Sequence, residues 1–326
     1  MRAVLCPSLG DEGGLQLADV PPPDMVDGGV RIAIVTAGVN FADGLLIAGR
    51  YQEKQEPPFI PGFEVAGRVS EIAPDVKDVE VGDRVMAVLG CGGFAEQVVA
   101  DARDVYRLPA SMDMSTAAGF PIAYGTSHHS LTAKAHLRPG ETLLVHGAAG
   151  GVGLTAVEIG CALGATVIAS AGGGAKRDLA LAHGAHFGID YQSEDLRNRV
   201  KALTGGRGVD VVYDPVGGEA FGASLHCTAP EARLLVIGFA SGVVPQIPAN
   251  LLLVKNLSVI GYNWGAFRRL DPAALRQSFN TLLEWFDQGR LKPIVTETLP
   301  LANAAEAIAK LKHRQASGKL VLTIEN

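Results

Sequence analysis

A glycine-rich turn constrains this chain more than any other stretch. It occupies 146–153 with the sequence HGAAGGVG, between an apolar run at 143–145 and a helical apolar pattern at 154–163. A second buried strand is expected at 165–169, which completes a strand–turn–helix–strand unit of roughly 30 residues. Glycines allow the backbone to approach a phosphate closely, and the helix N-terminus then directs N–H groups at the anion. We therefore predict a dinucleotide site, with a purely structural turn as the alternative. The predicted contacts are Gly147, Gly150, Gly151, Val152 and Gly153.

The end of the second strand indicates which dinucleotide binds. An NAD site usually carries Asp or Glu roughly 20 residues past the turn, where the carboxylate accepts hydrogen bonds from the ribose. Here the strand ends in Ala169, Ser170 and Ala171, and Lys176 and Arg177 follow a run of three glycines. Cations at this place favour a ribose 2′-phosphate, so we expect NADPH rather than NADH. In the alternative interpretation, the two cations only begin the next helix in water.

Length, composition and charge exclude several classes of protein. The chain has 326 residues, 48% of them hydrophobic, which is enough for two domains with sizeable cores. Its net charge of −6 argues against a nucleic-acid or anionic-membrane binder. The apolar runs are too short for a membrane span, and the N-terminus begins as a strand without a signal peptide. These features predict a cytoplasmic enzyme.

The pattern of predicted secondary structure changes twice along the chain. Residues 1–119 contain short strands separated by Pro and Gly turns, which suits a small β-barrel. Six buried strands alternating with helices follow at 120–262 and predict a doubly wound parallel sheet. The pattern breaks again at 263–326, with a helix after Asp271 and a closing strand at 319–324. We expect this last segment to complete the first domain, so that the sheet domain is an insertion.

The chain resembles the medium-chain dehydrogenase/reductase superfamily, and within it the zinc-independent quinone oxidoreductases that include zeta-crystallin. The resemblance covers nearly the whole length and implies an α/β fold with a GroES-like β-barrel catalytic domain and a six-stranded Rossmann domain. Its markers are GVNFADGLL at 38–46, PGFEVAGRV at 61–69, VGDRV at 81–85, AYGTSHHSL at 123–131, HGAAGGVG, DPVGG at 214–218, VIGFASG at 236–242 and GKLVLTI at 318–324.

Departures from the zinc enzymes of this superfamily imply a protein without a metal. Where those enzymes carry histidine in a Gly-His-Glu motif, this chain has Phe63, which cannot bind zinc. Asn40 stands where their catalytic cysteine lies, and the cysteine lobe for a structural zinc is missing. His128 and His129 point about 100° apart on a helix, so we expect them to be structural or solvent-facing.

Without a Lewis acid, the acceptor has to take hydride readily, as quinones and activated enones do. The resemblance implies an NADPH-dependent reductase of such acceptors, with Asn40, Phe41 and Asp43 beside the nicotinamide. Tyr51 is the candidate proton donor, or only lines the wall, because Leu45 replaces a second tyrosine of the family. Two alternatives stay open. One is a reductase of a small activated acrylate or acyl-thioester, and the other is an NADPH-binding protein with little turnover.

The resemblance also places coenzyme contacts along the chain and implies a homodimer. Two of the implied residues have an alternative role. Lys319 could be solvated, and Tyr191 could pack at the edge of the sheet. We expect two subunits to join through their Rossmann sheet edges at 257–261, since an unpaired apolar edge favours aggregation. The implied coenzyme residues are Phe41, Thr126, Ser170, Gly174, Lys176, Tyr191, Gly238, Phe239, Ala240, Ser241, Tyr262, Asn263, Trp264 and Lys319.

Overall fold

The structure is a computed structural model that describes residues 1–324, and the chain divides into two compact units. The first comprises Met1–Ile122 and the chain from Pro293 onward, and the second comprises Ala123–Lys292. The second unit thus extends past the expected boundary at Tyr262. It includes α10 (Pro272–Asp287), because Phe279 packs edge-on against Trp264 and Ser278 Oγ lies 2.7 Å from His128 Nδ1.

The first unit is built around a seven-stranded sheet with the order β14-β15-β3-β4-β5-β7, in which β6 also pairs with β3. The long central strand β3 (Gly29–Val39) contributes Ile32 and Ile34 to the core. The last strand, β15 (Lys319–Thr323), runs antiparallel to β3. The remaining elements are β1 (Arg2–Leu5), β2 (Gln16–Asp19), α1 (Phe41–Ile47), β4 (Glu64–Ile72), β5 (Arg84–Val88), β6 (Gln97–Asp101), β7 (Val105–Arg107), α2 (Met114–Ala118), β14 (Val295–Pro300), α11 (Ala304–Lys312) and three short 3-10 turns at Glu12–Gly14, Ala102–Asp104 and Leu301–Asn303.

The second unit contains the predicted six-stranded parallel sheet, in the doubly wound order β10-β9-β8-β11-β12-β13. The α/β fold class with a GroES-like domain and a Rossmann domain is confirmed. The elements are α3 (Pro121–His129), a π-helical turn at Ser130–Lys134, β8 (Thr142–His146), α4 (Gly151–Ala162), β9 (Thr166–Ala171), α5 (Gly174–Ala182), β10 (Phe187–Asp190), α6 (Leu196–Leu203), β11 (Val209–Asp214), α7 (Gly218–Leu225), β12 (Thr228–Val236), α8 (Ala249–Lys255), β13 (Ser258–Gly261) and α9 (Phe267–Leu270).

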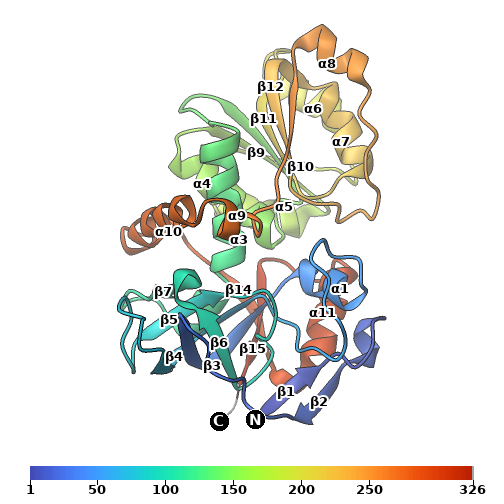
Figure 1. The fold of residues 1–326 in the computed structure, drawn as a ribbon. Coiled ribbons are helices and arrows are strands. Elements are labelled where there is room, and N and C mark those ends of the chain that lie inside the picture. The colour runs from blue at the N-terminus through green and yellow to red at the C-terminus, as the bar shows by residue number, and fades with distance from the viewer. Residues whose placement is uncertain (325–326) are drawn as a thin grey trace. The chain divides into compact units, whose positions relative to one another are not determined.

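Helices cover both faces of this sheet, with α4 on one side and α6, α7 and α8 on the other (Figure 1). Because side chains alternate along a strand, Leu144 and Ile168 face the cluster formed with α6 and α7. Leu143 and Val167 face α4, where a Cβ on Gly160 would lie 2.6 Å from Leu143 Cδ2. The absent side chain at Gly160 thus lets α4 lie directly on the sheet.

β12 begins five residues earlier than the apolar run at 233–237 indicates, at Thr228. The early part contains Pro230 and Glu231, which resemble a turn, and Glu231 has a φ of 62°. The register with β11 shifts between Val209 and Val211 at this place. An irregular strand start of this kind interrupts the apolar pattern by which a strand is recognised.

No helix within residues 1–324 combines the length and the apolar character that crossing a bilayer requires.

Candidate functional site

The turn between β8 and α4 depends on a contact that only glycine permits. A Cβ on Gly153 would lie 2.1 Å from the carbonyl oxygen of Gly147, and Gly147 itself has a φ of 57°. The Gly150 N–H donates to the same carbonyl oxygen at 2.9 Å. The helix start is therefore held against the turn.

The N-terminus of α4 is suited to an anion. Gly150 is the N-cap residue, and no side chain of the described chain caps the helix there. The first turn, which begins with Gly151 and Val152, contains no acidic residue. The first N–H groups of a helix need partners and lie at the positive end of its dipole. This geometry fits a pyrophosphate group of a dinucleotide.

Ser170 occupies the end of β9, where an NAD site would carry an acid. Its side chain is 1% exposed, and its Oγ has no hydrogen-bond partner within the described residues. An unpaired buried hydroxyl costs about 1–3 kcal/mol. A polar ligand atom that reaches the strand end could supply the missing partner.

The glycine run after β9 is held in place by an acid that the sequence pattern did not single out. Asp190, at the end of β10, accepts hydrogen bonds from the N–H groups of Gly173 at 2.8 Å and Gln192 at 3.0 Å. The Gly173 hydrogen bond is the main cause that lowers the pKa of Asp190. A Cβ on Gly172 would lie 2.5 Å from the phenol oxygen of Tyr191, so this ring lies directly on the loop.

Cations begin the following helix, α5. Gly174 is its first residue, and Lys176 lies half-buried in its first turn. The Arg177 guanidinium pairs with Asp178 at 2.9 Å, so its charge has a local partner. Lys176, half-buried in the first turn of α5, is the cation that the resemblance assigns to a ligand phosphate.

Two further loops meet at the carboxyl edge of the sheet. The N–H groups of Ala240 and Ser241 donate to the carbonyl oxygens of Pro215 and Val216 at 3.0 and 2.9 Å. Buried Asp214 accepts from the N–H groups of Val216 and Gly217, which fixes this second loop. The segment with Gly238, Phe239, Ala240 and Ser241 is thus tied to the end of β11, at the sheet edge where open α/β folds bind ligands.

The three predicted coenzyme residues after β13 differ in burial and in hydrogen-bond partners. The Tyr262 phenol is buried and lies 2.7 Å from His129 Nδ1, so its polar end has an internal partner. Trp264 packs onto Gly125, and its buried Nε1 has no partner within residues 1–324. Asn263 is exposed, and Thr126 is buried on α3.

In the first unit, Asn40, Asp43, Glu64 and Lys319 form a buried charged cluster. The Lys319 ammonium donates to Glu64 Oε1 at 2.7 Å, to Asn40 Oδ1 at 2.8 Å and to the Val39 carbonyl at 3.0 Å. The three N–H groups of the ammonium thus have internal acceptors, which is unlike the solvated lysine that the sequence allowed. We infer that Lys319 positions its neighbours rather than a coenzyme.

The same cluster fixes both ends of the Asn40 amide. Its Nδ2 donates to Glu64 Oε1 at 2.9 Å while its Oδ1 accepts from Lys319. The backbone N–H of Asn40 donates to Asp43 Oδ2 at 2.7 Å. Asp43 is fully buried, and desolvation is the main cause that raises its pKa to about 7. The Lys319 ammonium pairs with the Glu64 carboxylate, so Asp43 is the carboxylate that burial leaves poorly compensated.

Tyr51 and Phe41 are both at least partly exposed to solvent. The Tyr51 ring packs on Phe63, with ring centroids 5.1 Å apart, so Phe63 supports the tyrosine in place of a metal-ligand histidine. Phe41, the first residue of α1, is 38% exposed. Tyr51 is partly exposed, which is compatible with a phenol that donates a proton or with a ring that forms part of a wall.

Metal ligands do not gather in the described chain. Among residues 1–324, no three His, Cys, Asp or Glu side chains converge in a way that could hold an ion. His128 and His129 are both buried and bond different elements, through Ser278 and Tyr262. Burial is the main cause that lowers the pKa of both histidines.

Comparison with known proteins identifies the family. Residues 26–110 match the model of an alcohol dehydrogenase GroES-like domain, and residues 151–288 match that of a zinc-binding dehydrogenase. The chain is 41% identical to a quinone oxidoreductase-like protein 2 homolog from Nematostella vectensis, over 98% of this chain and 88% of that protein. The chain belongs to the quinone oxidoreductase family of the medium-chain dehydrogenases and reductases. It is thus an oxidoreductase by family.

Two solved structures resemble the chain along its length. Escherichia coli quinone oxidoreductase complexed with NADPH superposes with a TM-score of 0.92 at 30% identity, covering 99% of this chain and 100% of that one. A mycobacterial protein complexed with NADPH superposes with a TM-score of 0.93 at 32% identity, with the same coverage.

The buried Asp43 gives the cluster a measurable pH dependence. Because its folded-state pKa of about 7 lies above the usual value, folding takes up a proton between about pH 4 and pH 7. Stability should therefore fall as the pH rises through that window. In Asp43→Asn this decrease should be weaker, as measured by urea denaturation across the pH range. Asp24→Asn, at an exposed position of the same unit, should keep the wild-type slope. An identical slope in wild type and Asp43→Asn would contradict the assignment.

Proposed function

We propose that this chain uses NADPH to reduce quinones or activated enones by hydride transfer, without zinc. The observation that carries the proposal is the end of β9, which has the unpaired Ser170 hydroxyl in place of an acid and is followed by Lys176. This end suits a ribose that bears a phosphate. The two NADPH complexes among the similar structures support the same coenzyme.

In this proposal the second unit binds the coenzyme. The N-terminus of α4 receives the pyrophosphate at Gly150, Gly151 and Val152. Ser170, Gly174 and Lys176 receive the ribose phosphate, with Tyr191 beside the glycine run. The loop at 238–241 and the exposed Asn263 supply contacts toward the nicotinamide. When bound, the coenzyme would supply the hydride.

In this proposal the first unit binds the hydride acceptor. The chain places Phe63 where a zinc ligand would be needed, and the carboxylate of Glu64 is matched by the Lys319 ammonium. This donor set does not suit a Lewis-acidic ion, so the acceptor has to be activated already. Quinones and enones meet that requirement because reduction relieves their electron deficiency.

The residues of this unit have two different roles in the proposed reaction. Asn40, Asp43 and Lys319 are positioning residues, because their polar atoms bond one another and keep the start of α1 rigid. Tyr51 is the candidate to give a proton to the acceptor oxygen, which gains negative charge when the acceptor takes the hydride. One hydride and one proton together account for the two-electron reduction.

The acceptor is tested directly with the purified full-length chain and NADPH. We expect loss of NADPH absorbance with ortho- or para-quinones or with small enones. Faster turnover of an acrylate or acryloyl thioester than of any quinone would assign the alternative substrate class. Tight NADPH binding without turnover of any of these acceptors would leave only a binding role and contradict the proposal.

The coenzyme preference is tested at Lys176. Lys176→Ala should weaken NADPH binding about tenfold, equivalent to about 1.4 kcal/mol, because one phosphate contact is lost. NADH binding should stay unchanged, since NADH lacks that phosphate. Tryptophan fluorescence quenching measures both affinities. Lys77→Ala, an exposed lysine in the first unit, is the control. Equal weakening of both coenzymes would show that Lys176 does not recognise the phosphate.

We also propose that two copies join through the β13 edge of the sheet. Within the described chain β13 pairs only with β12, so its other edge is open for a second strand. Large apolar side chains near this edge are exposed, with Leu253 and Val254 on α8 each at 78%. A second copy of the same surface would cover both the strand edge and these side chains.

A double substitution tests the dimer. Leu253→Glu with Val254→Glu should convert the protein to a monomer, because two carboxylates on each copy would repel across a symmetric interface. Light scattering measures the mass at micromolar concentration. Leu17→Glu, at an exposed leucine of the first unit, should not change the mass. A monomeric wild-type protein would refute the proposed assembly.

A further inference from the structure

A basic cavity lies at the amino end of the parallel sheet, which is the end opposite the coenzyme loops. It has a volume of about 320 Å³ and lies at the amino ends of β11 and β12, where Gly208 and Thr228 contribute to its wall. Parallel strands bind ligands at their carboxyl ends in this fold, so the family site does not account for the cavity. Its full lining is Arg197, Lys201, Gly206, Arg207, Gly208, His226, Cys227, Thr228, Pro230 and Lys255.

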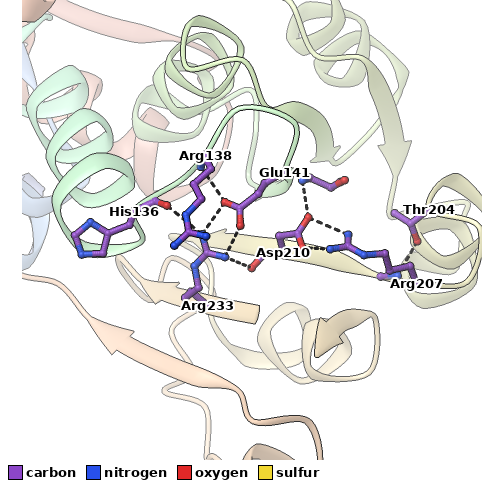
Figure 2. A network of polar contacts seen from close by, with 9 residues as sticks. His136, Arg138, Glu141, Thr204, Arg207, Asp210 and Arg233 are labelled. Carbon is purple, nitrogen blue, oxygen red and sulfur yellow. Dashed lines mark hydrogen bonds and ion pairs between the residues drawn. The ribbon is translucent and has the colours of Figure 1, made fainter. Parts of the chain in front are cut away.

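The lining contains four permanent cations and no acid, although the whole chain carries a net charge of −6. One of the cations is compensated from outside the lining. Figure 2 shows Arg207 turned toward Asp210, with an Nη1 to Oδ2 distance of 3.0 Å. Asp210 also accepts from the N–H of Thr142 at 2.8 Å, so this carboxylate has its own structural role. Arg197, Lys201 and Lys255 are left as the uncompensated cations.

Helix ends explain two of these three cations. Lys255 ends α8, and its ammonium donates to the carbonyls of Leu225 at 3.2 Å and Thr228 at 3.1 Å, near the C-terminus of α7. Lys201 lies in the last turn of α6, where a cation is favourable. Neither position therefore requires a ligand by itself.

Arg197 is not explained in this way. It lies in the first turn of α6, where the helix dipole disfavours a cation, and it stands four residues before Lys201. Like charges at this spacing destabilise a helix. Neither side chain forms a hydrogen bond or ion pair within the described chain, and the nearby Asp195 carboxylate caps α6 through the Asn198 N–H at 2.7 Å.

The electrostatics of Lys255 agree with mutual repulsion in the cavity. Burial is the main cause that lowers its pKa, and the charges of Lys201 and Arg197 lower it further. A cluster of this kind is unfavourable in the protein alone. It becomes favourable when an anion lies among the three cations, since charge-assisted hydrogen bonds to phosphate are strong.

We propose that this cavity is a second anion site, which binds a phosphate group carried free or on a small metabolite. Its volume lies at the lower end of the range for small-molecule sites, which admits a phosphorylated molecule of modest size. Arg197 and Lys201 would contact the phosphate from α6, and Lys255 would contact it from the end of α8. The site lies apart from the proposed coenzyme contacts, and the proposal does not depend on the reaction.

The test compares two charge-removing variants of α6. Arg197→Gln with Lys201→Gln removes the two uncompensated cations that α6 contributes. Arg199→Gln removes one charge from the same helix outside the cavity, where Arg199 pairs with Glu194 at 3.0 Å. Isothermal titration of the full chain uses inorganic phosphate, glucose 6-phosphate and, as the uncharged match, glucose.

We expect phosphate or glucose 6-phosphate to bind the wild type and Arg199→Gln alike, and the double variant at least about tenfold more weakly. In phosphate-free buffer the double variant should be at least as stable as the wild type, because a repulsion is removed. Tighter binding of glucose 6-phosphate than of phosphate would assign a phosphorylated metabolite, and the reverse would assign the free ion.

Three binding results would overturn the proposal. They are absence of binding to the wild type at millimolar phosphate, equal binding by the double variant, and loss of binding in Lys176→Ala instead, which would place the anion at the coenzyme site. A double variant that is less stable than the wild type in phosphate-free buffer would show that the cations only support helix ends.

Discussion

The close contact between Gly153 and the carbonyl of Gly147 is the constraint on which the second unit depends. It holds the start of α4 at the end of β8, and the bare Cα of Gly160 lets the same helix lie flat on the sheet. The neighbouring loops then join the turn, since a Cβ on Gly147 would already lie 3.3 Å from Val216. Backbone atoms therefore shape this end of the sheet, and a ligand there would be recognised mainly by N–H groups.

The first unit depends instead on a buried cluster of charged side chains. Lys319 lies between Glu64 and Asn40, and Asp43 is buried with little compensation. Removing one partner of such a buried set is costly, because the remaining charge has no water to solvate it. The cluster is therefore suited to hold the start of α1 rigid, and we assign it positioning rather than contact with a reacting group.

The sequence predicted the elements that have a clear period and left out those that depend on contacts distant in the chain. The six strands and the β8–α4 turn could be predicted, because apolar runs and glycine spacing are local signals. The early start of β12 was hidden by Pro230 and Glu231. The packing of α10 with the second unit, which runs to Lys292, depends on contacts with α3 and Trp264 that have no local signal. The roles of Asp190 and Glu64 could not be predicted, because they bond groups on other loops and strands. Their only local signal is an acid at the end or start of a buried strand.

The position of Lys319 has a consequence for biosynthesis. The ribosome completes the whole second unit before it adds β15, the strand that brings this ammonium to Asn40 and Glu64. Domains fold largely as they emerge during translation. The nascent chain therefore carries an unfinished first unit, in which Glu64 and Asn40 lack the Lys319 ammonium, until β15 has left the exit tunnel. A message truncated before β15 would thus yield a formed nucleotide-binding fold attached to a first unit that lacks the strand between β14 and β3.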